Sequence, residues 1–117
     1  MGLKDLKHRL TASAQELDRN RLKDRYSGLG LTKIAEAPLR QPVRIGGEIQ
    51  GIQIAPRGGN PSLEVNVTDG SGKAVAVFTG RRRISGLDCG RGVLLEGVGR
   101  TENGRIVLVN PAYTLLD

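Results

Sequence analysis

The chain has 117 residues, enough for one domain with an appendage, and its 18 Lys and Arg against 12 Asp and Glu give a formal net charge of +6. This balance favours an anionic partner such as nucleic acid. A single cysteine excludes an intrachain disulfide, and no apolar run suits a secretory signal or a membrane span, so we expect a cytoplasmic protein without a membrane role.

Residues 1–41 are expected to form a basic helical arm that ends in a linker. An apolar stripe recurs at spacings of three and four residues, formed by Leu3, Leu6, Leu10, Ala14 and Leu17. Ser13 and Glu16 match a capping box, which would begin a second short helix near residue 13, and Gly28 and Gly30 predict the end of helix. Because an isolated helix of this length is marginal in water, we expect the arm to be ordered only in part.

Residues 42–117 carry the alternating pattern of β-strands, separated by turn residues. Gly51 breaks the alternation of the first strand, which indicates a bulge in a strongly bent strand. A loop is expected at 55–61, hairpin turns at 69–72 and 102–104, and a short helix or turn within 80–91. The expected strands cover 43–54, 63–68, 73–79, 93–100 and 105–116. Five short strands of this kind predict a small closed or nearly closed barrel, because closure removes exposed edges.

The barrel region resembles the nucleic-acid-binding type of OB-fold, and is similar to the wedge domain of RecG-type branch-migration helicases. The resemblance lies in VRIGGEI, VTDGSG, VFTG, GRGVLLEGVG and NGRIVLVNPAY. The whole chain is similar to a group of small actinobacterial OB-fold proteins through LTASAQELD, GRRRISGL and NPAY. The resemblance implies a mainly β protein: a five-stranded OB-fold barrel over 42–117 with a helical, partly flexible N-terminal arm over 1–41.

Three consecutive arginines, Arg81, Arg82 and Arg83, follow the third expected strand. In an up-down-up meander the first and third strands end on the same side, so Arg57 in the first loop is expected nearby. An arginine fork suits phosphate, and OB-folds bind ligands across the face of strands two and three. We call these four residues the arginine rim and predict that it binds phosphates. The alternative is a solvated turn, with one arginine paired to Asp88.

Further candidate contacts to nucleic acid are Arg44, Lys73, Arg105 and Asn66. For each of these the favoured interpretation is an ordinary solvated position on a strand. Phe78 could stack on a base or lie in the core: it faces outward if Val75 and Val77 point inward, and a shift of one residue reverses this. The core is favoured for Phe78, and for Tyr113 with its hydroxyl at the surface.

Catalysis has little support in the sequence. His8 is the only histidine, and Cys89 has no histidine near it, so neither a catalytic site nor a metal or cofactor site is expected. The sequence therefore predicts a non-catalytic protein that binds nucleic acid, single strands above duplex, with little sequence specificity and with DNA and RNA both open. The alternative is a protein-interaction adaptor, in which residues 3–25 pack on a partner or on a second copy and the barrel is a scaffold.

Overall fold

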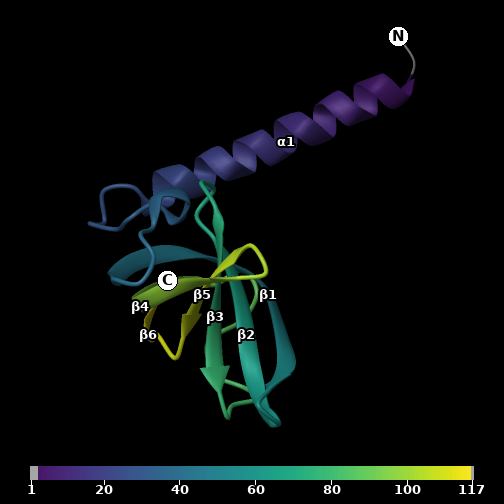
Figure 1. Cartoon of the computed structure of the whole chain (residues 1–117). Coiled ribbons are helices and arrows are strands. Elements are labelled where there is room, and N and C mark those ends of the chain that lie inside the picture. Colours follow the sequence, from purple (N-terminus) through teal and green to yellow (C-terminus); the bar gives the residue numbers. More distant parts are fainter. Residues whose placement is uncertain (1–2, 117) are drawn as a thin grey trace.

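The computed structural model describes residues 3–116, with the side chains of residues 13–116, as a β-barrel with a long helix at one end (Figure 1). The helical elements are α1 (Leu3–Tyr26) and the short 3-10 helix η1 (Ile34–Glu36). The strands are β1 (Pro42–Arg57), β2 (Asn60–Thr68), β3 (Lys73–Thr79), β4 (Gly92–Glu102), β5 (Arg105–Val109) and β6 (Ala112–Leu116). The mainly β architecture with an N-terminal helix is as the sequence predicted.

Five strands close into a ring. Their order is β1-β2-β3-β5-β4, and β1 returns to pair with β4 from Pro42 opposite Val98 to Glu48 opposite Gly92. The β3–β5 pair is parallel and the other pairs are antiparallel. The register of β1 shifts between Ile49 and Gly51, which confirms the predicted bulge. The bulge lets β1 bend enough to pair with β4 in its first half and with β2 in its second.

The last strand is interrupted, where the sequence pattern predicted one continuous strand over 105–116. Asn110 has a φ of 50°, in the left-handed region, and Pro111 lacks the N–H that a continuous ladder needs. The Asn110 side chain holds the break, because its Oδ1 accepts a bond from the Thr79 N–H at 3.0 Å and its Nδ2 donates to the Thr79 hydroxyl at 2.9 Å. Both halves pair with β4, so β5 and β6 together form the fifth strand of the barrel.

Two hairpins are tighter than ordinary loops. Gly58 and Gly59 have φ angles of 56° and 81°, and Asn103 and Gly104 have 51° and 76°. Positive φ at both central residues is the signature of a two-residue type I′ turn, which matches the twist of paired strands. The hairpin turn predicted at 102–104 is thereby confirmed. The predicted seven-residue loop is wrong, because the Gly-Gly turn lets β1 and β2 pair as far as Arg57 opposite Asn60.

The β2–β3 register decides which residues fill the barrel. Leu63 lies opposite Phe78 and Val65 opposite Ala76, and these side chains belong to the main core. Phe78 is 6% exposed, so the core alternative for this ring is correct. Val75 and Val77 point to the outer face instead, where they form a second buried cluster with Val107.

Residues 3–26 form one helix, so the predicted division into two short helices is wrong. The stretch from Ser13 to Leu17 contains no helix breaker, and the capping residues Ser13 and Glu16 simply lie exposed on a continuing helix. The side chains of Leu3, Leu6, His8 and Leu10 lie outside the described side chains.

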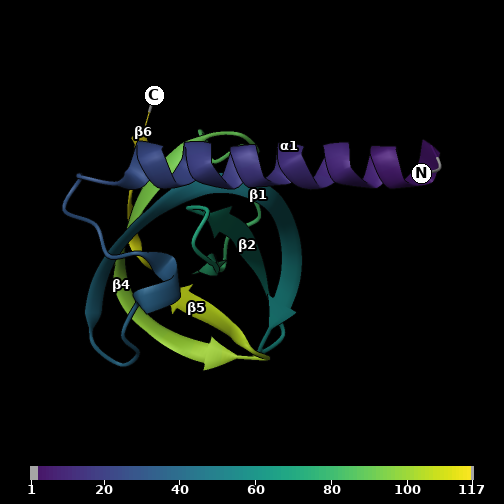
Figure 2. The same cartoon turned by 90° about the horizontal axis from the view of Figure 1, so that it is seen from above.

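The C-terminal turns of α1 dock on the barrel. Leu22 and Tyr26 are 2% and 5% exposed, whereas Leu17 is 70% exposed. Figure 2 shows the helix crossing one end of the barrel and continuing past its edge. The approach is so close that a Cβ at Gly70, in the β2–β3 turn, would collide with the carbonyl oxygen of Arg19. The arm therefore contacts the barrel from Arg19 onward, and Leu22 and Tyr26 are its buried residues.

A buried carboxylate joins the segment after α1 to the β2–β3 turn. Asp69 is 5% exposed, and its Oδ2 accepts a bond from the N–H of Ile34, which begins η1, at 3.0 Å. Its Oδ1 accepts bonds from the Ser71 N–H at 2.9 Å, the Ser71 hydroxyl at 2.7 Å and the Gly72 N–H at 3.2 Å. One side chain thus satisfies donors from two segments that are far apart in the sequence.

Replacing Asp69 by Ala is expected to lower the free energy of unfolding by about 1–3 kcal/mol, because buried N–H groups would lose their acceptor. Urea unfolding followed by circular dichroism measures the change. Asp88→Ala is the matched control, since Asp88 is exposed and a surface change is expected to stay within about 0.5 kcal/mol. Equal effects at the two positions would show that the Asp69 bonds do not support the fold.

Candidate nucleic-acid interface

The three consecutive arginines are exposed immediately after β3. Arg81, Arg82 and Arg83 form no ion pair with any acidic residue in the described part of the chain, Asp88 included. The segment contains turns rather than the short helix that was one of two expectations. Three adjacent guanidinium groups are therefore free to bind an anion.

Apolar residues hold this segment in place. Ile84 and Leu87 are 6% and 4% exposed and belong to the barrel core. The Leu87 N–H donates to the Ile84 carbonyl at 3.2 Å, and Gly86 between them has a φ of 89°. At the other end of the segment, the Gly80 N–H donates to the Pro61 carbonyl at 2.9 Å. The arginines are thus presented from a loop that is fixed at both ends.

Arg57 lies at the expected end of the sheet, but its side chain is already engaged. It pairs with Asn60 across the β1–β2 hairpin, next to the Pro61–Gly80 bond. Its Nη1 and Nη2 donate to the two carboxylate oxygens of Glu102 at 3.2 and 2.9 Å. This bidentate bond lowers the pKa of Glu102 below its ordinary value and raises the pKa of Arg57. The ion pair is therefore formed at neutral pH.

The Arg57–Glu102 pair, which we call the clasp, joins two separate hairpins. Arg57 lies in the β1–β2 hairpin and Glu102 in the β4–β5 hairpin, with β2, β3 and β5 between them in the ring. Both residues lie beyond the segment where β1 and β4 pair directly. The clasp therefore closes over the outer face of these three strands, where Val75, Val77 and Val107 are at most 2% exposed.

One hydrogen-bond donor of the clasp has no partner in the described part of the chain. The Nε of Arg57 is buried without a hydrogen-bond partner among the described residues. A second acidic side chain lies on the same face, since Glu64 is 7% exposed and accepts a bond from Gln53 Nε2 at 2.8 Å. As the structure stands, this face is neither aromatic nor strongly basic, so an anionic ligand has to displace the carboxylate of Glu102 to use Arg57.

The other predicted contacts are dispersed over the barrel. Lys73 and Arg105 begin the neighbouring parallel strands β3 and β5, are exposed, and form no ion pair with the described acidic residues. Asn66 is half-buried on the outer face, one residue along β2 from the inward Val67. Arg44 binds Glu96 at 2.8 Å on the β1–β4 side of the barrel. The structure thus separates Arg44 from the other candidates.

The aromatic residues offer little stacking surface. Phe78 is buried, so its ring is not available to a base. Tyr113, expected to be mainly in the core, is 41% exposed and packs edge-on against Phe78 at 5.7 Å between ring centroids. Tyr26, the last residue of α1, is buried where the helix packs on the barrel, and burial raises the pKa of its hydroxyl. Tyr113 is therefore the one ring of the three that reaches the surface.

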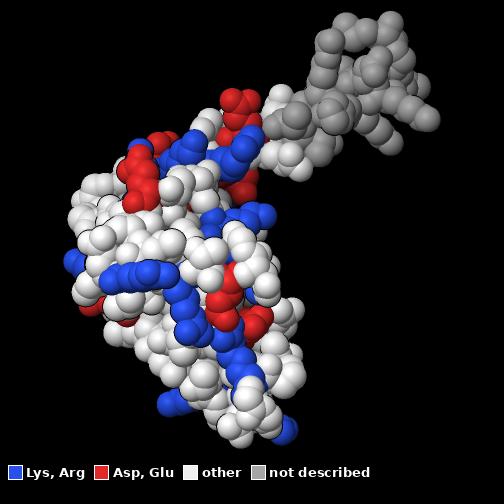
Figure 3. All heavy atoms as spheres, viewed as in Figure 1, with Lys and Arg blue, Asp and Glu red and all other residues white. Residues whose placement is uncertain are grey.

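Positive charge on the arm is partly neutralised by the barrel. Arg21 bonds both Asp18, at 2.8 Å, and Glu48 of β1, at 3.2 Å. Arg25 lies 3.7 Å from the same Glu48 carboxylate and 5.4 Å from the centroid of the Tyr26 ring. The space-filling view shows the result, with Lys and Arg interspersed with Asp and Glu over the visible face (Figure 3). The periodicity of the helix could not predict the contacts of Arg21 and Arg25 with Glu48, because they join residues far apart in the sequence.

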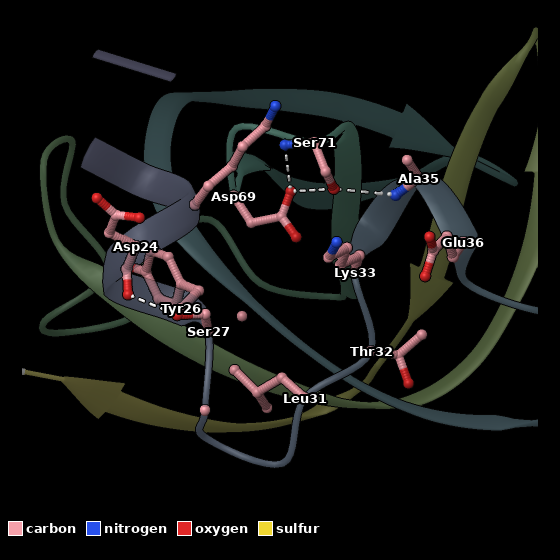
Figure 4. Close-up of a pocket in the computed structure, with 13 residues that line it drawn as sticks. Asp24, Tyr26, Ser27, Leu31, Thr32, Lys33, Ala35, Glu36, Asp69 and Ser71 are labelled. Carbon is pink, nitrogen blue, oxygen red and sulfur yellow. Dashed lines mark hydrogen bonds between the residues drawn. The ribbon is translucent and has the colours of Figure 1, made fainter. Parts of the chain in front are cut away.

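A cavity of about 540 Å³ lies where the arm meets the barrel (Figure 4). Its walls come from the end of α1, from the segment through η1 and from the β2–β3 turn, where the Ala35 N–H donates to the Ser71 hydroxyl at 3.2 Å. Both signs of charge line it, with Lys23 and Lys33 opposed by Asp24 and Glu36. This mixture gives the cavity no preference for an anion.

Comparisons with known proteins identify the fold of the barrel. No protein-family model and no curated protein matches the sequence. Among solved structures, a chain of a replication protein A heterotrimer bound to single-stranded DNA aligns with a TM-score of 0.52 and 14% identity over 71% of this chain and 62% of that chain. A chain of the S. pombe Stn1–Ten1 complex aligns with a TM-score of 0.52 and 21% identity over 70% of this chain and 62% of that chain.

The barrel is an OB-fold. The chain spans less than two thirds of the length of either of these structures. In an OB-fold the face of strands two and three, between the first and last hairpins, is the usual place for an oligonucleotide. The clasp lies over this face, and the arginine triplet follows its third strand.

Two further kinds of feature, metal sites and membrane-spanning helices, were sought in the described residues. Among residues 13–116, whose side chains are described, no group of three or more His, Cys, Asp or Glu side chains is placed to hold a metal ion. Within residues 3–116, no helix combines the length and the apolar character that crossing a bilayer requires.

Proposed function

We propose that this OB-fold protein binds single-stranded nucleic acid without catalysis and with little sequence specificity, in the cytoplasm. The observation that carries the proposal is the exposed, unpaired triplet Arg81–Arg83, which follows β3, one of the two strands whose face binds oligonucleotides in OB-folds. One structural neighbour is bound to single-stranded DNA, which supports the same class of ligand. The resemblance to the wedge domain of RecG-type helicases and to small actinobacterial OB-fold proteins agrees with it.

Low sequence specificity follows from the kinds of side chain that are available to contact nucleic acid. Arginine forks bind backbone phosphates, which are the same at every base, whereas stacking requires exposed rings. Only Tyr113 among the three aromatics is exposed to a useful extent. Lys73 and Arg105 would add phosphate contacts at the start of β3 and β5.

The test is fluorescence anisotropy with labelled single-stranded and duplex DNA and RNA, at about 50 and about 200 mM salt. We expect single strands to bind more tightly than duplex, and the affinity to fall steeply with salt because phosphate binding releases counterions. No binding of any of the four ligands in the lower salt would refute the proposal.

Glu102→Gln is expected to raise the affinity for oligo-dT about fivefold, because it removes a charge that repels phosphate and releases Arg57. Glu96→Gln is the matched control, since it removes the same charge from the Arg44–Glu96 pair on the other side of the barrel. Equal gains in the two variants would mean that net charge, not the clasp, limits binding.

The clasp also predicts a pH dependence. Because the pKa of Glu102 is lowered, the ion pair stabilises the fold above the ordinary carboxyl pKa. This stabilisation is lost as pH falls through the lowered pKa. Wild-type affinity should therefore rise toward that of Glu102→Gln only in acid, which anisotropy across a pH series measures.

The adaptor alternative keeps one specific observation in its favour, the 70% exposure of Leu17 on the free part of α1. Light scattering on the full chain and on a variant lacking residues 1–18 tests it. The cut has to fall before Leu22, because Leu22, Tyr26 and Ile34 are buried. A monomer in both samples argues against self-association, whereas a larger mass that is lost on truncation supports the adaptor.

A further inference from the structure

A shallow groove of about 790 Å³ lies on the outer side of β4 and β5, where the chain enters β1. Its lining includes Leu39, Val98 and Val109 together with Arg40 and Arg100. The groove contains none of the four residues of the arginine rim. It adjoins the clasp, because Arg100 contacts Glu102, but the nucleic-acid proposal does not use its apolar residues.

Three exposed apolar side chains lie together in the lining of the groove. Leu39, Val98 and Val109 are 42%, 53% and 37% exposed, and they are three of the seven large hydrophobic residues that are exposed in the described part of the chain. Exposed apolar residues scattered singly are ordinary, but a contiguous group with a polar border is typical of an interaction site. The grouping indicates a surface that another molecule covers.

The border of the groove is positively charged. Arg40 is exposed and forms no ion pair with an acidic residue in the described part of the chain, while Arg100 makes only a long contact of 3.6 Å with Glu102. Two cations beside an apolar floor are complementary to a ligand that carries an apolar group and a negative charge together.

The backbone fixes Arg40 in this position. Its φ is 63°, a left-handed conformation that residues with a side chain rarely adopt, and its N–H donates to the Gly99 carbonyl at 2.9 Å. Glycine would take the same conformation with less strain. The backbone at this position favours glycine. The chain has an arginine there instead, which places a guanidinium group beside the groove.

We infer that this groove binds a partner protein through a short segment in which an aliphatic or aromatic side chain stands next to Asp or Glu. The apolar side chain would cover Leu39, Val98 and Val109, and the carboxylate would lie between Arg40 and Arg100. A nucleic acid fits less well, because bases stack on rings and this floor is aliphatic. The inference is independent of the nucleic-acid proposal.

The test begins with a library of short random peptides displayed on phage and selected on the full chain. We expect the enriched sequences to carry Asp or Glu next to a large apolar residue. Anisotropy with one enriched, labelled peptide should then show a loss of affinity of about tenfold or more in Val98→Asp, because a buried contact at the centre of an interface is removed. Ile54→Asp is the control, since Ile54 is 58% exposed on β1 outside the groove, and its affinity should be unchanged.

Arg40→Gly is a second variant that does not put folding at risk, because glycine suits the φ of 63°. It should weaken peptide binding severalfold while the urea midpoint stays level or rises. Oligo-dT affinity in Val98→Asp should stay within about twofold of that in Ile54→Asp, which adds the same charge outside the groove, since the groove contains no residue of the rim. The inference is overturned if no peptide is enriched, if enriched peptides are basic, if Val98→Asp binds them normally, or if Val98→Asp abolishes oligo-dT binding.

Discussion

Replacing Arg81, Arg82 and Arg83 together by Ala is expected to lower the affinity for oligo-dT about a hundredfold in about 50 mM salt. Each phosphate contact to a single strand contributes about 0.7 to the slope of log affinity against log salt, so three lost contacts flatten that slope by about 2. Anisotropy titrations at four or more salt concentrations give both quantities. The arginines are exposed and unpaired, so the fold should be unaffected.

The matched control removes the same three charges from the arm. Arg19, Lys23 and Lys33 are exposed on the helix and the segment after it, away from the end of β3. Their joint replacement by Ala lowers the net charge equally but leaves the rim intact, so the loss of affinity should be much smaller. An equal loss would show that overall charge, rather than a site at the end of β3, binds the oligonucleotide.

Leu22→Ala is expected to lower the free energy of unfolding by about 2–4 kcal/mol, because it opens a cavity between α1 and the barrel. Leu22 is 2% exposed, so almost the whole side chain is lost from a packed site. Urea unfolding followed by circular dichroism measures the change.

Leu17→Ala makes the same substitution on the same helix at a residue that is 70% exposed. It should change stability by no more than about 0.5 kcal/mol, since no buried contact is removed. If the two substitutions had equal effects, the helix would not be seated on the barrel through Leu22.

Local sequence rules predicted the barrel well. Alternation located the strands, Asn103 and Gly104 identified a two-residue hairpin, and Gly51 identified the bulge. The errors arose where tertiary contacts decide the outcome. The break at Asn110 depends on bonds to Thr79 of a different strand. The error in the arm is local, because Ser13 matched a capping box although no residue near it ends the helix.

The candidate site was predictable only in part. Meander geometry placed Arg57 and the arginine triplet at one end of the sheet, which the β2–β3 register and the Gly80–Pro61 bond agree with. The direction of the Arg57 side chain was not predictable, because Glu102 lies 45 residues away in the sequence. The face of Phe78 likewise turned on one residue of hairpin register, which alternation alone leaves open.

The packing of α1 on the barrel also fixes how far the free end of the helix lies from the barrel and in which direction it points. From Leu17 back to Leu3, α1 extends as regular helix for about 20 Å at about 1.5 Å per residue. A flexible linker would leave the barrel free to tumble around whatever held the other end. A helix that packs on the barrel through Leu22 and Tyr26 does not allow this motion. A molecule that binds the free end of α1 therefore also fixes the direction in which the arginine rim faces.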